Sequence, residues 1–248
     1  MARHIEELIE RQVKRWNSIV HTLRYAPGDP AAGEPGLRHP VICMSRRLGS
    51  GARSINAILC ERLGYQVFGS ALIDEIARDL NVQRQLVNGL DERARGEIET
   101  LLDFYLEGKE ISPQDYFRSL VRVVEALTRL GGTILLGRGS SLILGERAGL
   151  RVFVTAPLEL RVRRLMQYES LDEATAQRKI AESDRERDAF VRKYWKVDVN
   201  DPLHYDMVIN SARLDPGTAA GLILHALEAR GFPAEQIALR HVAESGPR

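Results

Sequence analysis

VICMSRRLGSGARSINAILCERLG, residues 41–64, is the stretch that decides the fold. It begins with a short apolar run ending in small residues, which predicts a buried strand. Its second half places four apolar residues on one face of a helix: Ile55, Ile58, Leu59 and Leu63. A turn containing Gly49 and Gly51 joins the two halves. The stretch therefore predicts a strand, a glycine loop and a helix, in that order.

The same alternation continues along the rest of the chain. Further strands are predicted at GGTILLGRGSS (131–141), LRVFVTAP (150–157) and DMVINS (206–211). Helical patterns cover residues 71–80, about 91–130 with a break at 108–113, 159–169, 172–195 and 216–230, the last capped by Gly231. The runs at 131–141 and 150–157 have the unbroken apolar character of strands buried on both faces. Strands that alternate with helices predict a doubly wound α/β fold with a parallel sheet.

The two ends of the chain differ from this middle part. Residues 3–24 have apolar side chains at helical spacing and charged ones between them, which predicts an amphipathic helix. Residues 25–40 contain four prolines and three glycines, a composition typical of a linker. We therefore expect an N-terminal helix at 1–24, a linker at 25–40, one α/β domain at 41–232 and a tail at 233–248.

The composition excludes several function classes. The chain has 248 residues, 44% of them hydrophobic, and a formal charge of +1, so no bulk field marks a general nucleic-acid or membrane binder. No apolar stretch is long enough to span a bilayer, and the N-terminus lacks a signal-peptide pattern. Cys43 and Cys60 have no metal-site spacing and are expected to be buried thiols, which favours a reducing, cytoplasmic location. The six histidines show no zinc spacing, and Trp195 is expected to be a packing residue.

The glycine loop is the first candidate site. Gly49 and Gly51 allow backbone conformations that turn successive N–H groups inward, and a helix N-terminus follows with its partial positive charge. The segment from Gly49 through Ser50, Gly51, Ala52 and Arg53 to Ser54 is therefore a candidate phosphate cradle. The GxxxxGK(S/T) pattern is not met, although counting back from Ser54 puts Arg53 at the lysine position. The alternative is a plain glycine-rich turn with surface arginines.

Two further places carry unusual charges. Arg138 stands at the end of a predicted buried strand, where side chains in open α/β sheets meet ligands, and the alternative is a structural arginine paired to a nearby acid. The run 184–188, DRERD, is followed by Arg192 and Lys193. Asp184, Arg187 or Asp188, and Arg192 fall on roughly one helical face, but alternating charges also suit a solvated helix.

From the glycine loop onward the chain resembles the cytidylate kinase-like family, over about residues 41–230. The family's first loop, roughly SRQxGSGGRE, is similar to SRRLGSGARS at 45–54. Gly137-Arg138 looks like the start of the GRD at the corresponding strand end of cytidylate kinases. The pattern TDxxRxxYYRYYF is similar to Asp184, Arg187, Arg192 and Tyr194, and DPxxYDLVINT to residues 201–210.

This resemblance implies a P-loop NTPase-like three-layer fold with a helical lid or insert. It implies ATP and Mg²⁺ as cofactors, with ATP phosphates on Gly49 to Ser54 and the Ser54 hydroxyl on the metal. Arg53 would bind phosphate oxygens, Arg138 would hold the acceptor, and lid arginines Arg187 and Arg192 would neutralise the transferring phosphoryl group. The likeness to GSGKGT loops puts Ala52 at the lysine, so that charge is missing.

A second departure concerns the acceptor side. Where the family usually reads FYDKELI, this chain has VFGSALI, with Gly69, Ser70 and Ala71 in place of Asp, Lys and Glu. The first hypothesis is therefore a phosphotransferase that acts on a nucleoside monophosphate or another small acceptor. The alternative is a nucleotide-binding regulatory protein without catalysis, whose N-terminal helix docks on a partner or a second copy of the chain. Neither hypothesis involves a membrane, and a nucleic-acid partner has little support.

Overall fold

A computed structural model of the chain describes residues 40–78 and 116–232. Within these ranges five strands form one sheet in the order β2-β3-β1-β4-β5, and every neighbouring pair is parallel. The strands are β1 (Ile42–Arg46), β2 (Gln66–Gly69), β3 (Thr133–Leu136), β4 (Leu150–Thr155) and β5 (Met207–Asn210). The predicted α/β fold with a parallel sheet is confirmed.

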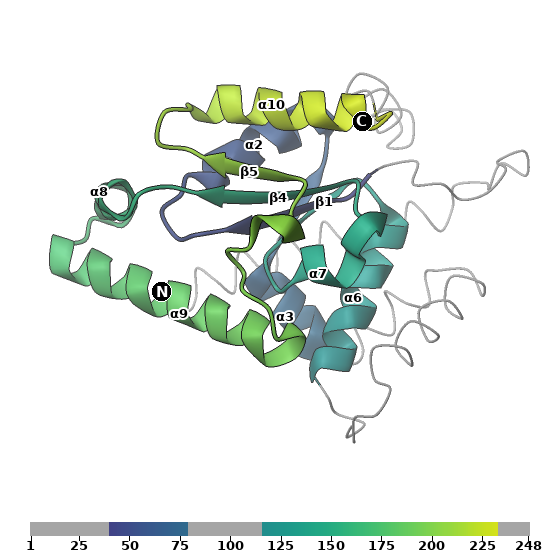
Figure 1. The fold of residues 1–248 in the computed structure, drawn as a ribbon, viewed down its shortest axis with the longest axis horizontal. Coiled ribbons are helices and arrows are strands. Elements are labelled where there is room, and N and C mark those ends of the chain that lie inside the picture. The colour runs from purple at the N-terminus through teal and green to yellow at the C-terminus, as the bar shows by residue number, and fades with distance from the viewer. Residues whose placement is uncertain (1–39, 79–115, 233–248) are drawn as a thin grey trace, which may run out of the picture.

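Helices cover both faces of this sheet and give three layers (Figure 1). The helices are α2 (Ala52–Leu63), α3 (Ser70–Arg78), α6 (Tyr116–Leu130), α7 (Ser140–Leu144), α8 (Leu158–Glu169), α9 (Glu173–Trp195) and α10 (Pro216–Ala229), with short 3-10 turns at Gly145–Arg147 and Pro202–His204. α2 and α10 pack on one face, and α3, α6 and α7 pack on the other. In the described ranges no helix has the length and apolar character needed to cross a membrane.

Two apolar clusters explain why the central strands have unbroken hydrophobic sequences. Successive strand residues point to opposite faces of a sheet. In β1, Ile42 and Met44 belong to the cluster under α2 and α10, whereas Cys43 belongs to the cluster under α3 and α6. All three side chains are fully buried. Ile134 and Leu135 of β3 and Val152 and Val154 of β4 are likewise fully buried, which confirms the two-sided burial predicted from the apolar runs at 131–141 and 150–157.

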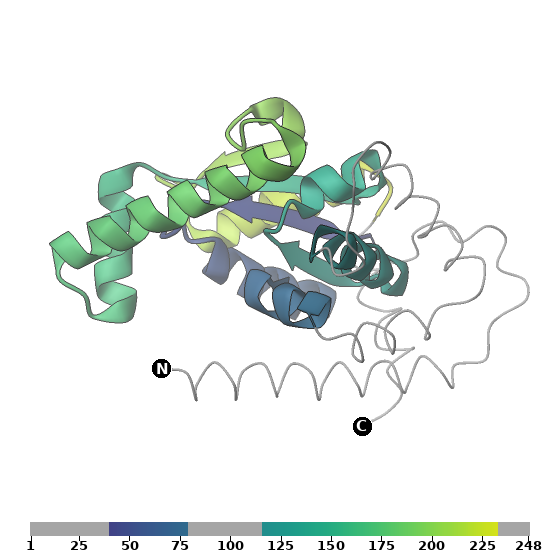
Figure 2. The ribbon, with the colours of Figure 1, turned by 90° about the horizontal axis from the view of Figure 1, so that it is seen from below.

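The long helix α9 lies with α8 beyond the edge of the sheet where the strands end (Figures 1 and 2). Its C-terminal end packs on α6 through aromatic rings. Phe117 stacks on Tyr194 with ring centroids 4.7 Å apart, and Trp195 meets Phe117 edge to face at 5.4 Å. Trp195 is thus a packing residue, as predicted. α9 is consequently anchored at this end and reaches past the carboxyl ends of the strands.

The edge strand β2 was not predicted. It comprises only QVFG, and the next residue, Ser70, already begins α3. Four residues carry too little alternation to reveal a strand, which forms here because β3 offers a free edge for pairing. The predicted helix at 1–24, most of the linker at 25–40, the first part of the helical region 91–130 and the tail at 233–248 lie outside the described residues.

The sheet register brings three strand ends together. Met44 of β1 pairs with Leu136 of β3, and Arg46 pairs with Val154 of β4. The pairing of β3 with β1 extends one residue beyond β3, because the Gly137 N–H donates to the Met44 carbonyl oxygen at 3.0 Å. Residues that follow β1 and β3 therefore meet at the carboxyl edge, where open α/β sheets bind ligands.

Candidate active site

The glycine loop joins β1 to α2 through two left-handed glycines. Gly49 has a φ of +77° and Gly51, the N-cap of α2, has a φ of +84°. A side chain at Gly49 would also have no room, because its Cβ would lie 2.6 Å from the backbone oxygen of Arg161 in α8. Both glycines are thus required by the backbone path, and the predicted strand, loop and helix are present.

The floor of the loop is fixed by the end of β5 and by α8. The Ser211 hydroxyl donates to the Ser50 carbonyl oxygen at 2.6 Å. The Arg164 guanidinium donates to the hydroxyl and carbonyl oxygens of Ser211 at 2.9 and 3.0 Å. These hydrogen bonds join segments far apart in sequence, so the loop has a defined position before any ligand binds.

The predicted phosphate-contacting residues lie together at the start of α2. Ala52 is buried, Ser54 is half-buried and its N–H donates to the Gly51 oxygen at 3.1 Å. Arg53 is exposed, and its guanidinium has no hydrogen bond or ion pair with any described residue. The N-terminus of this 12-residue helix, with Arg53 on its first turn, is an electropositive surface.

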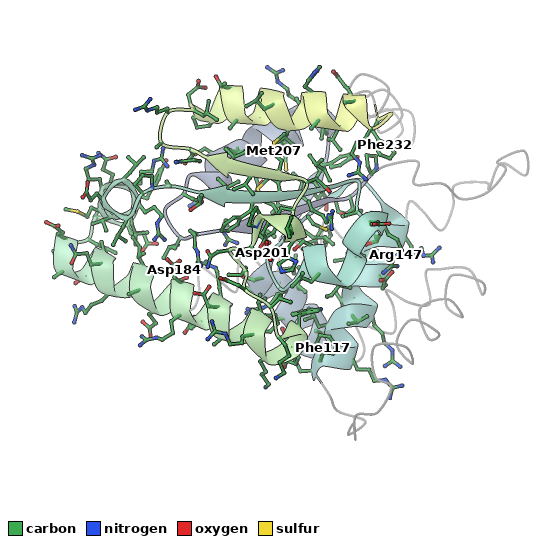
Figure 3. All side chains as sticks on the ribbon, viewed as in Figure 1. Phe117, Arg147, Asp184, Asp201, Met207 and Phe232 are labelled. Carbon is green, nitrogen blue, oxygen red and sulfur yellow. The ribbon has the colours of Figure 1, made fainter. Side chains whose placement is uncertain are left out.

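The charged run on α9 faces the loop. Arg47, which is 8% exposed, donates to Asp188 Oδ1 at 2.7 Å and to Asn200 Oδ1 at 2.5 Å. Arg161 donates to Asp184 Oδ2 at 2.7 Å and to the Leu48 oxygen at 3.3 Å. Asp184 lies in the middle of α9 (Figure 3). The inward charges of this run hold α9 against the loop, while Arg185 and Glu186 are exposed.

Arg187 and Arg192, the two predicted lid arginines, have different surroundings. Arg187 is half-buried and its Nη1 lies 3.7 Å from Asp184 Oδ1. Burial and the nearby charges of Arg47 and Arg138 lower the pKa of Arg187, against the opposite effect of Asp184. Arg192 is exposed and is absent from the residues lining the cavity described below. The structure thus brings Arg187 to the site and leaves Arg192 outside.

Arg138 has a left-handed backbone, with a φ of +55°, and a carboxylate partner. Its Nε donates to Asp74 Oδ1 at 2.6 Å and its Nη2 donates to Asp74 Oδ2. The Tyr116 hydroxyl donates to the same Oδ1 at 2.5 Å, and the guanidinium lies 5.1 Å above the Phe190 ring. Burial lowers the pKa of Arg138, but the hydrogen bond and charge of Asp74 outweigh it and the pKa is raised. This geometry matches the paired arginine that the sequence left open as an alternative.

A cavity of about 60 Å³ opens between the ends of β1 and β3 and the inner side of α9. Its lining includes three arginines, Arg46, Arg138 and Arg187, together with Ser70 and Phe190. The departure noted at 69–71 therefore lies at this cavity. A side chain at Gly69 would meet open space, since no atom lies within 4 Å of its Cβ position. The cavity is consequently lined by three arginines, and Ser70 of the departing segment is among its lining residues.

Several site residues were not predicted from the sequence. The sequence patterns assign no role to Arg46, which lies in the stretch similar to the family loop, nor to Arg47, Arg161 and Asp74. Two arginines directly after a buried strand were the available signal for Arg46 and Arg47. No local signal existed for Arg161 and Asp74, because their partners lie 23 and 64 residues away in sequence.

Metal ligands are sparse here. Over residues 40–78 and 116–232 no group of three or more His, Cys, Asp or Glu side chains is arranged to hold an ion. The Ser54 hydroxyl on the first turn of α2 is the predicted ligand. A single hydroxyl fits Mg²⁺ that is held mainly by substrate phosphates and water, since Mg²⁺ seldom has an all-protein cage.

Known proteins share both sequence and fold with this chain. The model of the cytidylate kinase-like family matches residues 41–213. A cytidylate kinase of Natronomonas pharaonis is 29% identical over 189 residues, covering 76% of this chain and 90% of that protein. A cytidylate kinase of Sulfolobus acidocaldarius is 28% identical and covers 74% and 91%, respectively.

The fold has a counterpart among solved structures as well. The crystal structure of an uncharacterised protein from Eubacterium ventriosum superposes with a TM-score of 0.61 at 21% identity. The match covers 77% of this chain and 99% of that one. This likeness supports the fold assignment independently of any site residue.

Proposed function

Since the chain belongs to the cytidylate kinase-like family and is a nucleoside monophosphate kinase-like enzyme, we propose that it transfers the γ-phosphate of ATP to a nucleoside monophosphate or another small acceptor. One observation carries the proposal. A glycine loop at a helix N-terminus lies next to a cavity lined by Arg46, Arg138 and Arg187. Two adjacent electropositive sites suit a donor and an acceptor that both carry phosphate.

The donor binds at the loop. The phosphates of ATP lie on the backbone from Gly49 to Ser54, where the α2 dipole attracts negative charge. Arg53 is exposed and lacks a partner among the described residues, so its guanidinium is available for phosphate oxygens. The Ser54 hydroxyl would hold Mg²⁺, and the bound ion would neutralise charge on the phosphates.

The oxygen of the acceptor that receives the phosphoryl group lies in the cavity beside the loop. Asp74 holds the Nε and Nη2 of Arg138 and thereby fixes the plane of the guanidinium, leaving its Nη1 for an acceptor oxygen. In the transfer an acceptor oxygen bonds to the γ-phosphorus while the bond to the bridging oxygen of ADP breaks. ADP leaves with that electron pair, and a hydroxyl acceptor releases its proton to water. Positioning and charge neutralisation are sufficient for such a reaction, so no nucleophilic side chain is required.

Helix α9 contributes the cation on the other side of the transferring group. Arg187 faces the cavity and its pairing with Asp184 at 3.7 Å is loose, which leaves the guanidinium able to turn to a phosphate. Arg192 would need a movement of α9 to take part, and its role stays a prediction. A cytoplasmic location and pairing of two chains through residues 1–24 are further parts of the proposal.

The test is an assay of ATP-to-ADP turnover with Mg²⁺ against nucleoside monophosphates, nucleosides and small phosphorylatable metabolites. ATP binding is measured in parallel by calorimetry. Acceptor-dependent ADP formation supports the kinase and identifies its acceptor class. Binding of ATP with no turnover would instead identify the regulatory alternative, and the absence of binding would refute both. In the same assay Arg53→Ala is expected to abolish transfer with the fold intact.

A further inference from the structure

Arg46 is a half-buried cation with no counter-ion among residues 40–78 and 116–232. It ends β1 and lines the cavity, and its guanidinium has no hydrogen bond or ion pair with the described residues. A Cβ at Gly137 would lie 3.9 Å from its Nη1, which places the guanidinium beside the end of β3. Burial, followed by the positive charges of Arg187 and Arg138, lowers the pKa of Arg46 to about 10. The folded protein therefore holds this cation in unfavourable surroundings.

The neighbouring arginines, unlike Arg46, each have a carboxylate partner. Arg47 has Asp188, Arg161 has Asp184 and Arg138 has Asp74, each within hydrogen-bond distance. Removing a charge from water costs free energy, and an ion pair offsets part of that cost. A buried charge without a partner has no such compensation. Arg46 thus contributes nothing evident to stability, and an anion from solution is the missing partner.

Arg46 stands where the donor loop and the cavity meet. The loop begins at the residue after it, and the cavity lies between its strand and β3. The transferring phosphoryl group has to pass between these two sites. On the loop itself, Ala52 occupies the position of the missing lysine and is buried, whereas the Arg53 side chain is exposed on the first turn of α2.

We propose that Arg46 is a catalytic residue that binds the transferring phosphoryl group, and that it replaces the charge that a lysine at position 52 would supply. This inference rests on the proposed function. The bond changes are those given above, namely formation of the bond from the acceptor oxygen to the γ-phosphorus and departure of ADP with the electron pair of the broken bond. Arg46 exchanges no proton, and its guanidinium neutralises charge on the oxygens of the group in transit.

The test compares Arg46→Met and Arg46→Lys with Arg62→Met as a matched control. Arg62 is an exposed arginine on the last turn of α2, at the opposite end of that helix from the loop. We expect Arg46→Met to lower kcat by about 100- to 1,000-fold, the usual effect of removing one donor to transition-state charge. Arg46→Lys should recover part of that loss, and Arg62→Met should match the wild type.

Thermal unfolding of the ligand-free proteins separates a catalytic role from a structural one. Replacing a structural arginine destabilises the fold and lowers Tm. Replacing a cation that has no counter-ion leaves Tm unchanged or raises it. We expect Arg46→Met to unfold at or above the wild-type Tm. Retained kcat, or a loss of activity that follows a lowered Tm, would overturn the inference while leaving the proposed function standing.

A third measurement does not depend on turnover. Inorganic pyrophosphate should raise the Tm of the wild type and of Arg62→Met, and should raise that of Arg46→Met much less. An equal increase in all three would overturn the assignment of Arg46 as a phosphate ligand. A wild type that turns over no acceptor would refute the proposed function and the catalytic role together, and the pyrophosphate result would still decide whether Arg46 binds phosphate.

Discussion

Replacing Gly49 by alanine tests whether the loop is as tightly determined as its contacts indicate. An alanine would have to adopt a φ of +77°, and its Cβ would meet the Arg161 carbonyl oxygen at 2.6 Å. Left-handed backbone costs a non-glycine residue about 1–2 kcal/mol. The contact cannot be relieved by a rotamer change, since the opposing atom is backbone. We therefore expect a total destabilisation of about 2–4 kcal/mol.

For a domain of this size such a loss corresponds to a decrease in Tm of roughly 5–15 °C. Differential scanning calorimetry measures this decrease in Tm. Calorimetric titration of the same sample with ATP should show an affinity reduced at least about tenfold, because a loss of about 1.4 kcal/mol in binding free energy lowers the affinity tenfold. The matched control is Gly221→Ala in the middle of α10, where no atom lies within 4 Å of the new Cβ. That substitution should stabilise the protein by about 1 kcal/mol, because alanine favours a helix.

The two variants carry the same substitution, and we expect opposite signs for the change in the free energy of unfolding. Gly49→Ala with wild-type Tm and wild-type ATP affinity would refute the argument that the loop path excludes a side chain. Destabilisation of similar size in Gly221→Ala would show that a methyl group is harmful wherever it is added, and would remove the support for a specific contact with Arg161.

Three other perturbations have outcomes that follow from the described contacts. Arg47→Ala should lower the free energy of unfolding by about 3 kcal/mol, because it leaves the Asp188 carboxylate of α9 unpaired beside the loop, and a loss below about 1 kcal/mol in urea titration would contradict this. Burial raises the pKa of Asp206, but the hydrogen bonds and charge of Arg151 outweigh it, so the net pKa is lowered. A lowered folded-state pKa stabilises the protein above the unfolded value of about 3.9, and this stabilisation is lost as the pH falls through the folded-state pKa. Asp206→Asn should therefore lower Tm at pH 7 and match the wild type once the pH is below both pKa values. Glu125 is 1% exposed and accepts two hydrogen bonds from Arg147, so Glu125→Gln should cost about 2–3 kcal/mol, measured as a shift of the urea midpoint at constant m.

The prediction of the fold succeeded where the pattern was local and strong. The apolar runs at 131–141 and 150–157 predicted strands buried on two faces, and the run at 41–45 predicted a buried strand. Each run contains a strand of the central sheet. Gly49 and Gly51 predicted a turn with unusual backbone, and both have positive φ. The strand β2 was missed because four edge residues have no distinctive period and depend on a neighbour for their conformation.

The sequence alone determined the parallel α/β architecture, the glycine loop and the family, because each depends on residues that are close together in the chain. Only the tertiary structure decided which charged residues are paired. Arg138 and Asp74 are 64 residues apart, and Arg47 and Asp188 are 141 residues apart. Two adjacent arginines of one motif differ in their pairing. The Arg47 guanidinium pairs with a carboxylate of α9, whereas the Arg46 guanidinium has no ion pair among the described residues. Whether a charge is neutralised depends on distances of a few ångströms in the folded chain, and one-dimensional spacing carries no information about them.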